Sequence, residues 1–289
     1  MDVVDYKELK KGGFMKQVQK DRFSLRLRVV GGQLKAEHLK KVYEIAEKFG
    51  SGYIHMTSRQ SLEIPFIKLQ DVETVKKELS LAGLQPGACG PRVRTITACQ
   101  GNEICPSGLI NTTDIAKEFD ERYYARELPH KFKLGITGCR NNCLKAEEND
   151  LGVKGGMNPN WQENKCSYCG LCEAICPTKA ISVNKVGKNL LLNEKDCNYC
   201  GKCVKSCPTN AWEGKSGYIV YFGGLFGNKI SIGQQLIPIL YTKEELHKVV
   251  ETTLKFFEKH GKQSERFANT LNRVGWELFK KELEEALYE

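Results

Sequence analysis

The sequence predicts an α+β protein of 289 residues in which a small cysteine-rich unit interrupts a larger domain. Three observations support this fold class. The N-terminal region shows alternating strand and helix periodicities, two short apolar strands are each followed by a cysteine pair, and a doubled cysteine motif stands between stretches of different character. We expect an N-terminal domain over residues 1–85, a second domain formed by 86–157 and 214–289, and an inserted domain over 158–213.

The first N-terminal elements are a strand and a helix. Residues 23–30 alternate apolar and polar side chains, as in a half-buried strand. Gly31 and Gly32 then turn the chain. Residues 36–49 carry apolar side chains at helical spacing, and Gly50 marks the C-terminal end of this helix.

Two short strands and a second helix complete the N-terminal domain. The strands are expected over residues 53–57 and 62–66. The helix begins at Val72, with Asp71 as its expected N-terminal cap. The resulting order β-α-β-β-α is typical of a ferredoxin-like half-domain.

The middle of the chain contains an internal repeat. Residues 165–177 read KCSYCGLCEAICP, and residues 196–208 read DCNYCGKCVKSCP. Both share the spacing C-x2-C-x2-C-x3-C-P, which is typical of two-cluster 4Fe–4S ferredoxins, where the fourth cysteine of each motif binds the other cluster. One predicted cluster therefore takes Cys166, Cys169, Cys172 and Cys207, and the other takes Cys197, Cys200, Cys203 and Cys176. Structural zinc is the alternative, but zinc sites usually combine two separated cysteine pairs.

Glycine-rich stretches flank this repeat, over residues 152–160 and 214–217. We expect both stretches to be weakly structured, which favours an inserted bacterial-type ferredoxin domain. Near the C-terminus, residues 242–260 and 265–287 have the periodicity of amphipathic helices and are expected to pack against the second domain.

Four of the five remaining cysteines form a second pattern. They are Cys99, Cys105, Cys139 and Cys143. Each pair follows a short apolar strand, predicted over residues 95–98 and 132–137, and ligands at strand ends commonly build sites. Four thiolates could hold a third cluster, while zinc or unligated core cysteines are the alternatives. Cys89 fits neither pattern and is expected to be a structural or free thiol.

Composition narrows the class of protein. Thirteen cysteines, an odd number, argue against a disulfide framework and for metal ligation. The apolar stretches are too short to cross a bilayer and no signal peptide is recognisable, so we expect a cytoplasmic protein without membrane insertion. The net charge is +9, but the positive residues are scattered with few aromatic residues among them, so nucleic acid is not an expected partner.

The C-x5-C … C-x3-C pattern resembles that of sirohaem-dependent sulfite and nitrite reductases. Nearly the whole chain is similar to the C-subunit type of anaerobic sulfite reductase, which has one half-repeat and an inserted two-cluster ferredoxin. The resemblance implies a ferredoxin-like half-domain followed by a sirohaem/4Fe–4S domain. It also implies the cofactors, sirohaem and three 4Fe–4S clusters, with Cys143 bridging one cluster to the sirohaem iron.

Polar and basic residues extend the resemblance. The segment HMTSRQ looks like the sirohaem-contacting T-x-R-Q segment of the family, RVRTITAC places an arginine on its active-site arginine, and LPHKFK places two lysines on its paired active-site lysines. The resemblance implies catalytic roles for Arg94, Lys131, Lys133 and Arg59. It implies cofactor contacts from Thr57, Arg59, Gln60, Arg94, Asn141 and Cys143.

Without the resemblance, the local sequence gives weaker evidence for the roles of these basic residues. The alternating Lys-Phe-Lys places Lys131 and Lys133 on one face of a strand, with Phe132 on the other. Without the resemblance, surface cations are the better interpretation of both lysines. Arg26 and Arg28 share a strand face and could meet sirohaem carboxylates or form a solvated face.

The implied reaction is the six-electron reduction of sulfite to sulfide, with electrons entering through the two ferredoxin-type clusters. A sirohaem nitrite reductase that forms ammonia, or a non-catalytic polyferredoxin, are the alternatives. We find no flavin or nicotinamide motif, so a ferredoxin or an electron-donor subunit is an expected partner. We also expect a homo-oligomer or a complex with flavin/iron–sulfur subunits.

Overall fold

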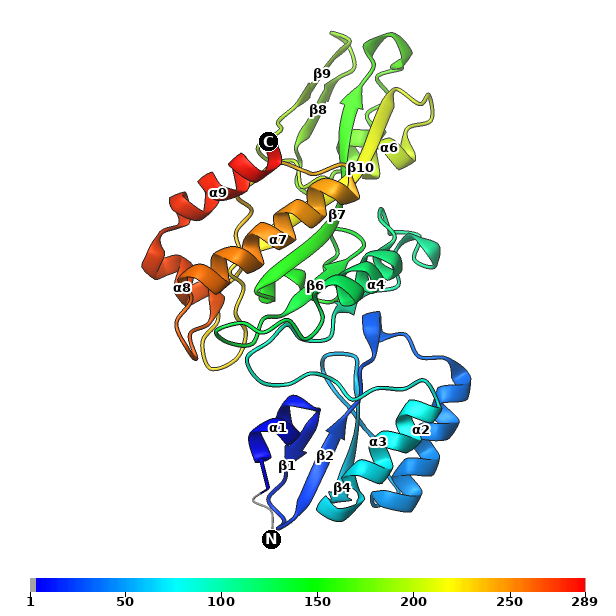
Figure 1. The fold of residues 1–289 in the computed structure, drawn as a ribbon. Helices are drawn as coiled ribbons and strands as arrows, with labels where there is room; N and C mark the ends of the chain where they lie inside the picture. Colours follow the sequence, from blue (N-terminus) through cyan, green and yellow to red (C-terminus); the bar gives the residue numbers. More distant parts are fainter. Residues whose placement is uncertain (1–3, 289) are drawn as a thin grey trace.

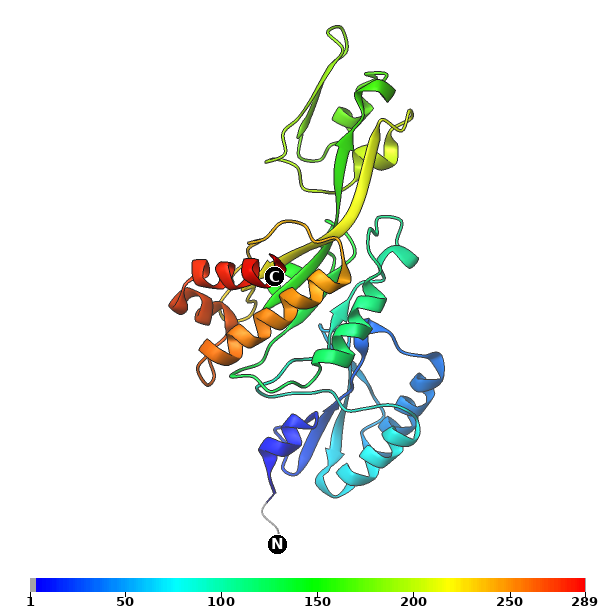
Figure 2. The same ribbon diagram turned by 45° about the horizontal axis from the view of Figure 1, so that its top comes forward.

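A computed structural model describes residues 4–288 and arranges them in three regions along one long axis (Figure 1). The N-terminal domain lies at one end, the larger second domain lies in the middle, and the cysteine-rich unit lies at the other end. The same order is seen after rotation (Figure 2). Each region has its own apolar core, so each buries apolar surface independently.

The N-terminal domain combines an antiparallel sheet with three helices. The strand order is β1-β2-β4-β3. The strands are β1 (Phe14–Lys16), β2 (Arg22–Arg26), β3 (His55–Met56) and β4 (Leu62–Lys68). The helices are α1 (Tyr6–Lys11), α2 (Ala36–Phe49) and α3 (Val72–Leu81). The predicted β-α-β-β-α order is confirmed, with α1 and β1 preceding it.

Two details of this domain differ from the prediction. The strand expected over residues 23–30 ends at Arg26, and Leu27 forms only an isolated bridge with Pro86. Asp71 stands at the start of α3, but its side chain makes no capping hydrogen bond. The predicted cap is wrong because a 3-10 turn over Leu69–Asp71 leads into the helix and holds Asp71 in helical backbone angles.

The second domain is built on a mixed sheet with the order β10-β7-β6-β5. The strands are β5 (Thr97–Ala98), β6 (Leu134–Thr137), β7 (Leu151–Trp161) and β10 (Trp212–Phe222). The helices are α4 (Thr112–Tyr123), α7 (Lys243–His260), α8 (Phe267–Val274) and α9 (Trp276–Tyr288). Strands β5, β6 and β7 are parallel, whereas β10 is antiparallel to β7.

The glycine-rich stretches are not weakly structured, and that expectation is wrong. Strands β7 and β10 pair over all eleven residues, from Leu151–Phe222 to Trp161–Trp212. Several of their glycines allow close approach of other backbone atoms. A Cβ at Gly155 would lie 2.2 Å from the carbonyl oxygen of Gly138, which no side chain could tolerate. The long ribbon carries the cysteine-rich unit away from the central core (Figure 1).

The C-terminal region also differs from prediction in one respect. The helix over residues 242–260 is confirmed, and Thr242 forms a capping box with Glu245. The second expected helix is two helices, α8 and α9. Gly275 separates them because its φ of +116° lies outside the helical range.

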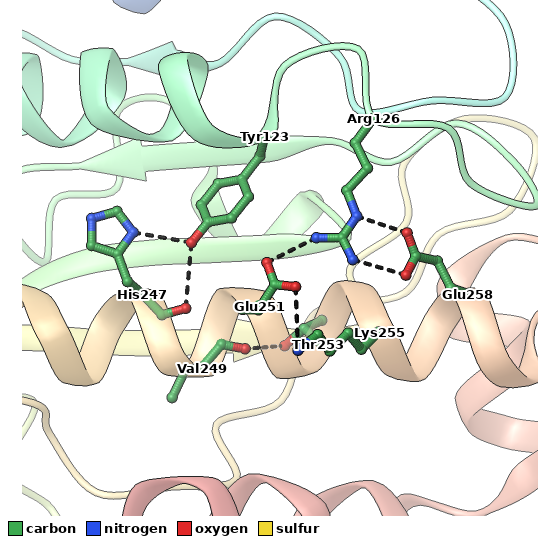
Figure 3. A network of polar contacts seen from close by, with 8 residues as sticks. All are labelled: Tyr123, Arg126, His247, Val249, Glu251, Thr253, Lys255 and Glu258. Atoms are coloured by element: carbon green, nitrogen blue, oxygen red, sulfur yellow. Dashed lines mark hydrogen bonds and ion pairs between the residues drawn. The ribbon is translucent and has the colours of Figure 1, made fainter.

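Polar contacts join the end of α4 and the following loop to α7 (Figure 3). The Tyr123 hydroxyl lies 3.0 Å from Nδ1 of His247. Arg126 donates to both carboxylate oxygens of Glu258, at 2.7 and 2.8 Å, and to Glu251 at 2.8 Å. These bonds fix the loop that leads into the Lys131–Lys133 segment.

The cysteine-rich unit has a two-stranded sheet and two short helices. They are β8 (Ile181–Asn184), β9 (Asn189–Leu192), α5 (Leu171–Ala174) and α6 (Lys202–Ser206). Across residues 4–288, no helix combines the length and apolar character needed to span a membrane.

Candidate functional site

Two adjoining cavities lie where the N-terminal and second domains meet. Their volumes are about 240 Å³ and 460 Å³, and both are lined by Ser58, Arg59 and Lys133. The smaller, which we call the cationic cavity, is lined by Arg26, Arg59, Arg94, Lys131 and Lys133. Among the described residues that line it there is no carboxylate. Such a concentration of positive charge fits an anionic occupant.

The loop between β3 and β4 contributes Arg59 and is held in place by Gln60. The Gln60 side chain pairs with Ala98 of β5 in both directions, at 2.9 and 3.0 Å. Arg59 donates to Asn149 Oδ1 at 2.9 Å and to the carbonyl oxygen of Thr95 at 3.1 Å. Burial lowers the pKa of Arg59 to about 10 despite the nearby carboxylate of Asp150. The guanidinium therefore stays charged at neutral pH.

Arg94 lies on the segment that precedes β5. Its Nη1 donates to the carbonyl oxygen of Ala88 at 3.2 Å, while Nε is buried without a partner within residues 4–288. Burial lowers the pKa of Arg94. Arg26 approaches the Cys89 sulfur at 3.7 Å and pairs with Glu63 at 2.6 Å. Cys89 is thus a buried thiol beside the cationic cavity, outside the four-cysteine pattern.

Lys131 and Lys133 line the cationic cavity on either side of the fully buried Phe132. Within residues 4–288, neither ammonium group has a hydrogen bond or ion pair to a side chain. Burial lowers the pKa of Lys133 to about 8, and the positive charge of Arg59 acts in the same direction. Burial, Arg266 and Arg94 lower the pKa of Lys131. Both lysines therefore release protons more readily than free lysine.

Sequence reasoning missed two charged residues beside this cavity. Asp150 is fully buried and accepts two bonds of 2.9 Å from Nη2 of Arg266. It also accepts the backbone N–H of Lys133 at 2.9 Å. Asp150 follows a strand-free loop and Arg266 precedes α8, so no short motif links them. A local signal could not have revealed this pair.

Some of the other candidate residues line one of the two cavities, and some lie outside both. Thr57 lines the cationic cavity, and Gln60 and Cys143 line the larger cavity. Asn141 is exposed and is not among the lining residues of either cavity. Arg28 is turned away, donating to Asp120 at 2.9 Å and lying 3.8 Å from the centre of the Tyr124 ring.

The four cysteines at the strand ends, which we call the inner set, gather around one loop. They are Cys99, Cys105, Cys139 and Cys143. Gly138 N–H points to the Cys99 sulfur at 3.0 Å. Burial raises the pKa of the Cys139 thiol, and the other three sulfurs are close enough to act in the same direction. Cys143 faces the larger cavity beside Arg59 and Asn149.

The cysteines of the repeat surround two separate small cavities. The middle set consists of Cys176, Cys197, Cys200 and Cys203. The outer set consists of Cys166, Cys169, Cys172 and Cys207. Within residues 4–288, none of the thirteen cysteines takes part in a disulfide. In the described part of the chain, no three Cys, His, Asp or Glu side chains converge closely enough to hold a single metal ion.

The three sets follow one another along the β7–β10 ribbon. Gly155 packs against Gly138, next to the inner set, and Met157 forms a bridge with Cys200 of the middle set. Trp212, paired with the last residue of β7, lines the cavity of the outer set. A strand rises about 3.3 Å per residue. The contact points of the inner and middle sets on the ribbon are therefore about 7 Å apart, and those of the middle and outer sets are about 13 Å apart.

Comparison with known proteins agrees with this geometry. Residues 89–289 match the nitrite and sulphite reductase 4Fe-4S domain, and residues 15–82 match the nitrite/sulfite reductase ferredoxin-like half domain. The chain is 36% identical over 260 residues to the Coenzyme F420-dependent sulfite reductase of Methanocaldococcus jannaschii, covering 89% of this chain and 41% of that protein.

Two further similarities extend the comparison. The chain is 33% identical over 169 residues to the C subunit of the anaerobic sulfite reductase of Salmonella typhimurium, covering 54% of this chain and 50% of that protein. It thus spans half or less of both relatives. The crystal structure of dissimilatory sulfite reductase I has a TM-score of 0.74 at 21% identity, covering 91% of this chain and 69% of that one, which shows a shared fold. This protein belongs to the nitrite and sulfite reductase 4Fe–4S family.

Proposed function

We propose that this protein reduces sulfite to sulfide with six electrons at a sirohaem centre. The observation that carries the proposal is the cationic cavity, which has five positive side chains and shares Arg59 and Lys133 with the larger cavity, where Cys143 of the inner set lies. Sulfite is a small oxyanion, and sirohaem carries carboxylates. Both would neutralise a cavity whose positive charges otherwise repel one another.

The residues present fit the proposed cofactors. Twelve free thiols in three sets of four supply the ligands of three 4Fe–4S clusters, and the middle and outer sets correspond to an inserted two-cluster ferredoxin domain. Sirohaem would be held by the cavity residues Thr57, Arg59, Gln60, Arg94 and Cys143, whereas Asn141 lies outside both cavities. When bound, sirohaem and the inner cluster supply an iron that holds the substrate and the electrons that reduce it.

Arg94, Lys131 and Lys133 would bind the substrate oxygens. Each can donate a charge-assisted hydrogen bond, worth roughly 1.5–3 kcal/mol. Neither lysine ammonium is engaged by a described side chain, and the Nε of Arg94 is buried without a partner, so these donors are available to a ligand. Arg59 is already engaged with Asn149 and Thr95, which suits a role in orienting the cofactor.

Lys133 is the better proton donor of the two lysines. Each oxygen of sulfite leaves as water, so each cleavage consumes protons close to the departing oxygen. With a pKa of about 8, Lys133 is protonated at neutral pH and gives up its proton more easily than an exposed lysine. The open cavity allows its reprotonation from solvent.

Electrons would pass from the outer set to the middle set and then to the inner set. This order follows the succession of contact points along the ribbon. The donor would be a ferredoxin or a flavin/iron–sulfur subunit in the cytoplasm, because one relative is named as a subunit and another as dependent on a coenzyme. We expect the chain to work within a homo-oligomer or such a complex.

Anaerobic purification followed by absorption spectroscopy and iron analysis tests the proposal. One sirohaem and about thirteen irons per chain would support it, since three four-iron clusters and one haem iron are expected. About twelve irons without tetrapyrrole, from a host that makes sirohaem, would identify an electron-carrying polyferredoxin instead.

The cationic cavity suits nitrite as well as sulfite, so nitrite reduction to ammonia is the second candidate. Nitrite reductases are among the relatives, at 29% identity over 48% of this chain in one case. Steady-state assays with each anion and a reduced viologen donor separate the two. A much larger kcat/KM for nitrite would reverse the order of the candidates.

A further inference from the structure

Asp150 occupies a central place behind the cationic cavity. Its side chain is fully buried and its two oxygens accept the Arg266 guanidinium and the backbone N–H of Lys133, all at 2.9 Å. The preceding residue, Asn149, accepts a hydrogen bond from Arg59. Two adjacent residues thus hold one cavity lysine and one cavity arginine.

Arg266 brings the start of α8 to this point from a distant part of the chain. Its side chain is 11% exposed, and it directs both bonds from a single nitrogen toward Asp150. The charged groups around Lys133 are Arg59, Arg266, Asp150 and Lys131. Asp150 is therefore the negative charge that offsets three neighbouring positive charges.

We propose that the buried Asp150–Arg266 pair is a positioning device that sets the place and charge of Lys133 in the cationic cavity. The Asp150 carboxylate accepts the Lys133 backbone N–H directly, while the Arg266 guanidinium orients that carboxylate. Burial raises the pKa of Asp150, and the Arg266 charge opposes this rise. Neither residue lines the cavity, and the hydrogen bond that links Asp150 to a cavity residue comes from the backbone N–H of Lys133. Any effect of this pair on catalysis rests on the proposed function, the reduction of sulfite.

The chain offers a matched control. Asp120 on α4 is 4% exposed and pairs with Arg28, but neither residue lines the cationic cavity or the larger cavity beside it. Substituting Asp120 removes the same type of buried carboxylate. If a change in Lys133 labelling came only from the loss of a buried ion pair, it would appear in both Asp150→Asn and Asp120→Asn.

The direct test measures the pH dependence of Lys133 acetylation in full-length protein. Acetic anhydride labelling, followed by peptide mass spectrometry, is compared for the wild type, Asp150→Asn, Arg266→Lys and the control Asp120→Asn. Removing the Asp150 charge should lower the labelling midpoint of Lys133 and raise its labelling at pH 7 about threefold. Arg266→Lys should give a smaller change, and Asp120→Asn none.

Sulfite turnover is measured on the same preparations. Asp150→Asn should lower kcat about tenfold or more, with partial retention in Arg266→Lys because a cation still faces Asp150. If Asp150→Asn does not fold, the double variant Asp150→Asn/Arg266→Gln leaves no buried charge unpaired. Its Lys133 labelling midpoint should rise rather than fall, because Arg266 lowers the pKa of Lys133 more than Asp150 raises it.

The outcomes separate this inference from the proposed function. A wild-type labelling midpoint in both Asp150 variants would overturn the positioning role, whatever the enzyme reduces. A clear labelling shift in a protein that binds no sirohaem and reduces no sulfite would uphold the positioning role and remove the proposed function.

Discussion

Lys133 shows how its surroundings change the chemistry of a single side chain. Lys133 directly precedes β6 and follows the fully buried Phe132, while its side chain lines a cavity shared with three arginines. Burial and neighbouring positive charge bring its pKa to about 8, where a free lysine has 10.5. A lysine with this pKa can both bind an anion and donate a proton near neutral pH.

This pKa predicts the alkaline limit of activity. If sulfite reduction requires protonated Lys133, kcat/KM should be steady at lower pH and fall as pH rises through about 8. Lys133→Arg should keep anion binding and move the fall to higher pH, but with a lower kcat because arginine does not release a proton. A pH profile of kcat/KM measures both effects, and an unchanged alkaline limit in Lys133→Arg would contradict the assignment.

The same burial predicts a stability gain when the lysine is removed. Because the folded-state pKa lies below the unfolded value, the ammonium form opposes folding fully below pH 8, and this penalty disappears above pH 10.5. After allowance for solvent screening, Lys133→Met should stabilise the cofactor-free protein by about 1–2 kcal/mol at pH 7. Urea unfolding at pH 7 and pH 10.5 measures the gain, which should shrink at the higher pH.

Among the elements, the β7–β10 ribbon links the cysteine-rich unit to the second domain. Its glycines are not flexible linkers. They allow β7 to pass within van der Waals distance of the loop that bears the inner set, while the strands remain paired throughout. Ribbon pairing therefore determines how near the inner and middle sets lie to each other.

Gly155→Ala tests this close approach. The added methyl group would lie 2.2 Å from the Gly138 carbonyl oxygen, so the strand or the inner loop must move. We expect a loss of about 1–3 kcal/mol of stability and incomplete loading of the inner cluster. Gly12→Ala is the control, since its Cβ would meet no atom closer than 3.6 Å. Iron content and thermal unfolding report the result, and full loading with unchanged stability would refute the packing argument.

For the whole molecule, the proposed electron path follows the order of the three cysteine sets. The outer set lies farthest from the cationic cavity and includes the exposed Cys169. The middle set lies between it and the inner set. Because electron tunnelling weakens steeply with distance, loss of the middle cluster leaves a wider gap than loss of the outer one.

Cys200→Ser and Cys169→Ser test this order. With a small viologen donor that reaches any exposed cluster, Cys200→Ser should lose more sulfite turnover than Cys169→Ser. Iron analysis and electron paramagnetic resonance must first show that each variant lacks one cluster alone. Equal losses in the two variants would show that the ribbon order does not describe the electron path.

Features that depend on nearby residues could be predicted from the sequence. Periodicity defined the helix over residues 36–49, and motif spacing grouped eight cysteines into two sets that the fold places around two separate cavities. The alternation of Lys131, Phe132 and Lys133 indicated which side chains share a face. These features follow from local geometry, because backbone periods and ligand loops span only a few residues.

Contacts between distant segments became apparent only in the folded chain. Glycine content suggested a loose linker at Gly155, whereas pairing with β10 makes this segment a strand. Arg26 and Arg28 were predicted to share one face of a strand, but they have different surroundings. Arg26 lines the cationic cavity, whereas Arg28 binds Asp120. Asp150 and Arg266 lie 116 positions apart and carry no shared motif. Such pairs form because buried charges require partners, and the folded chain decides which partner is within reach.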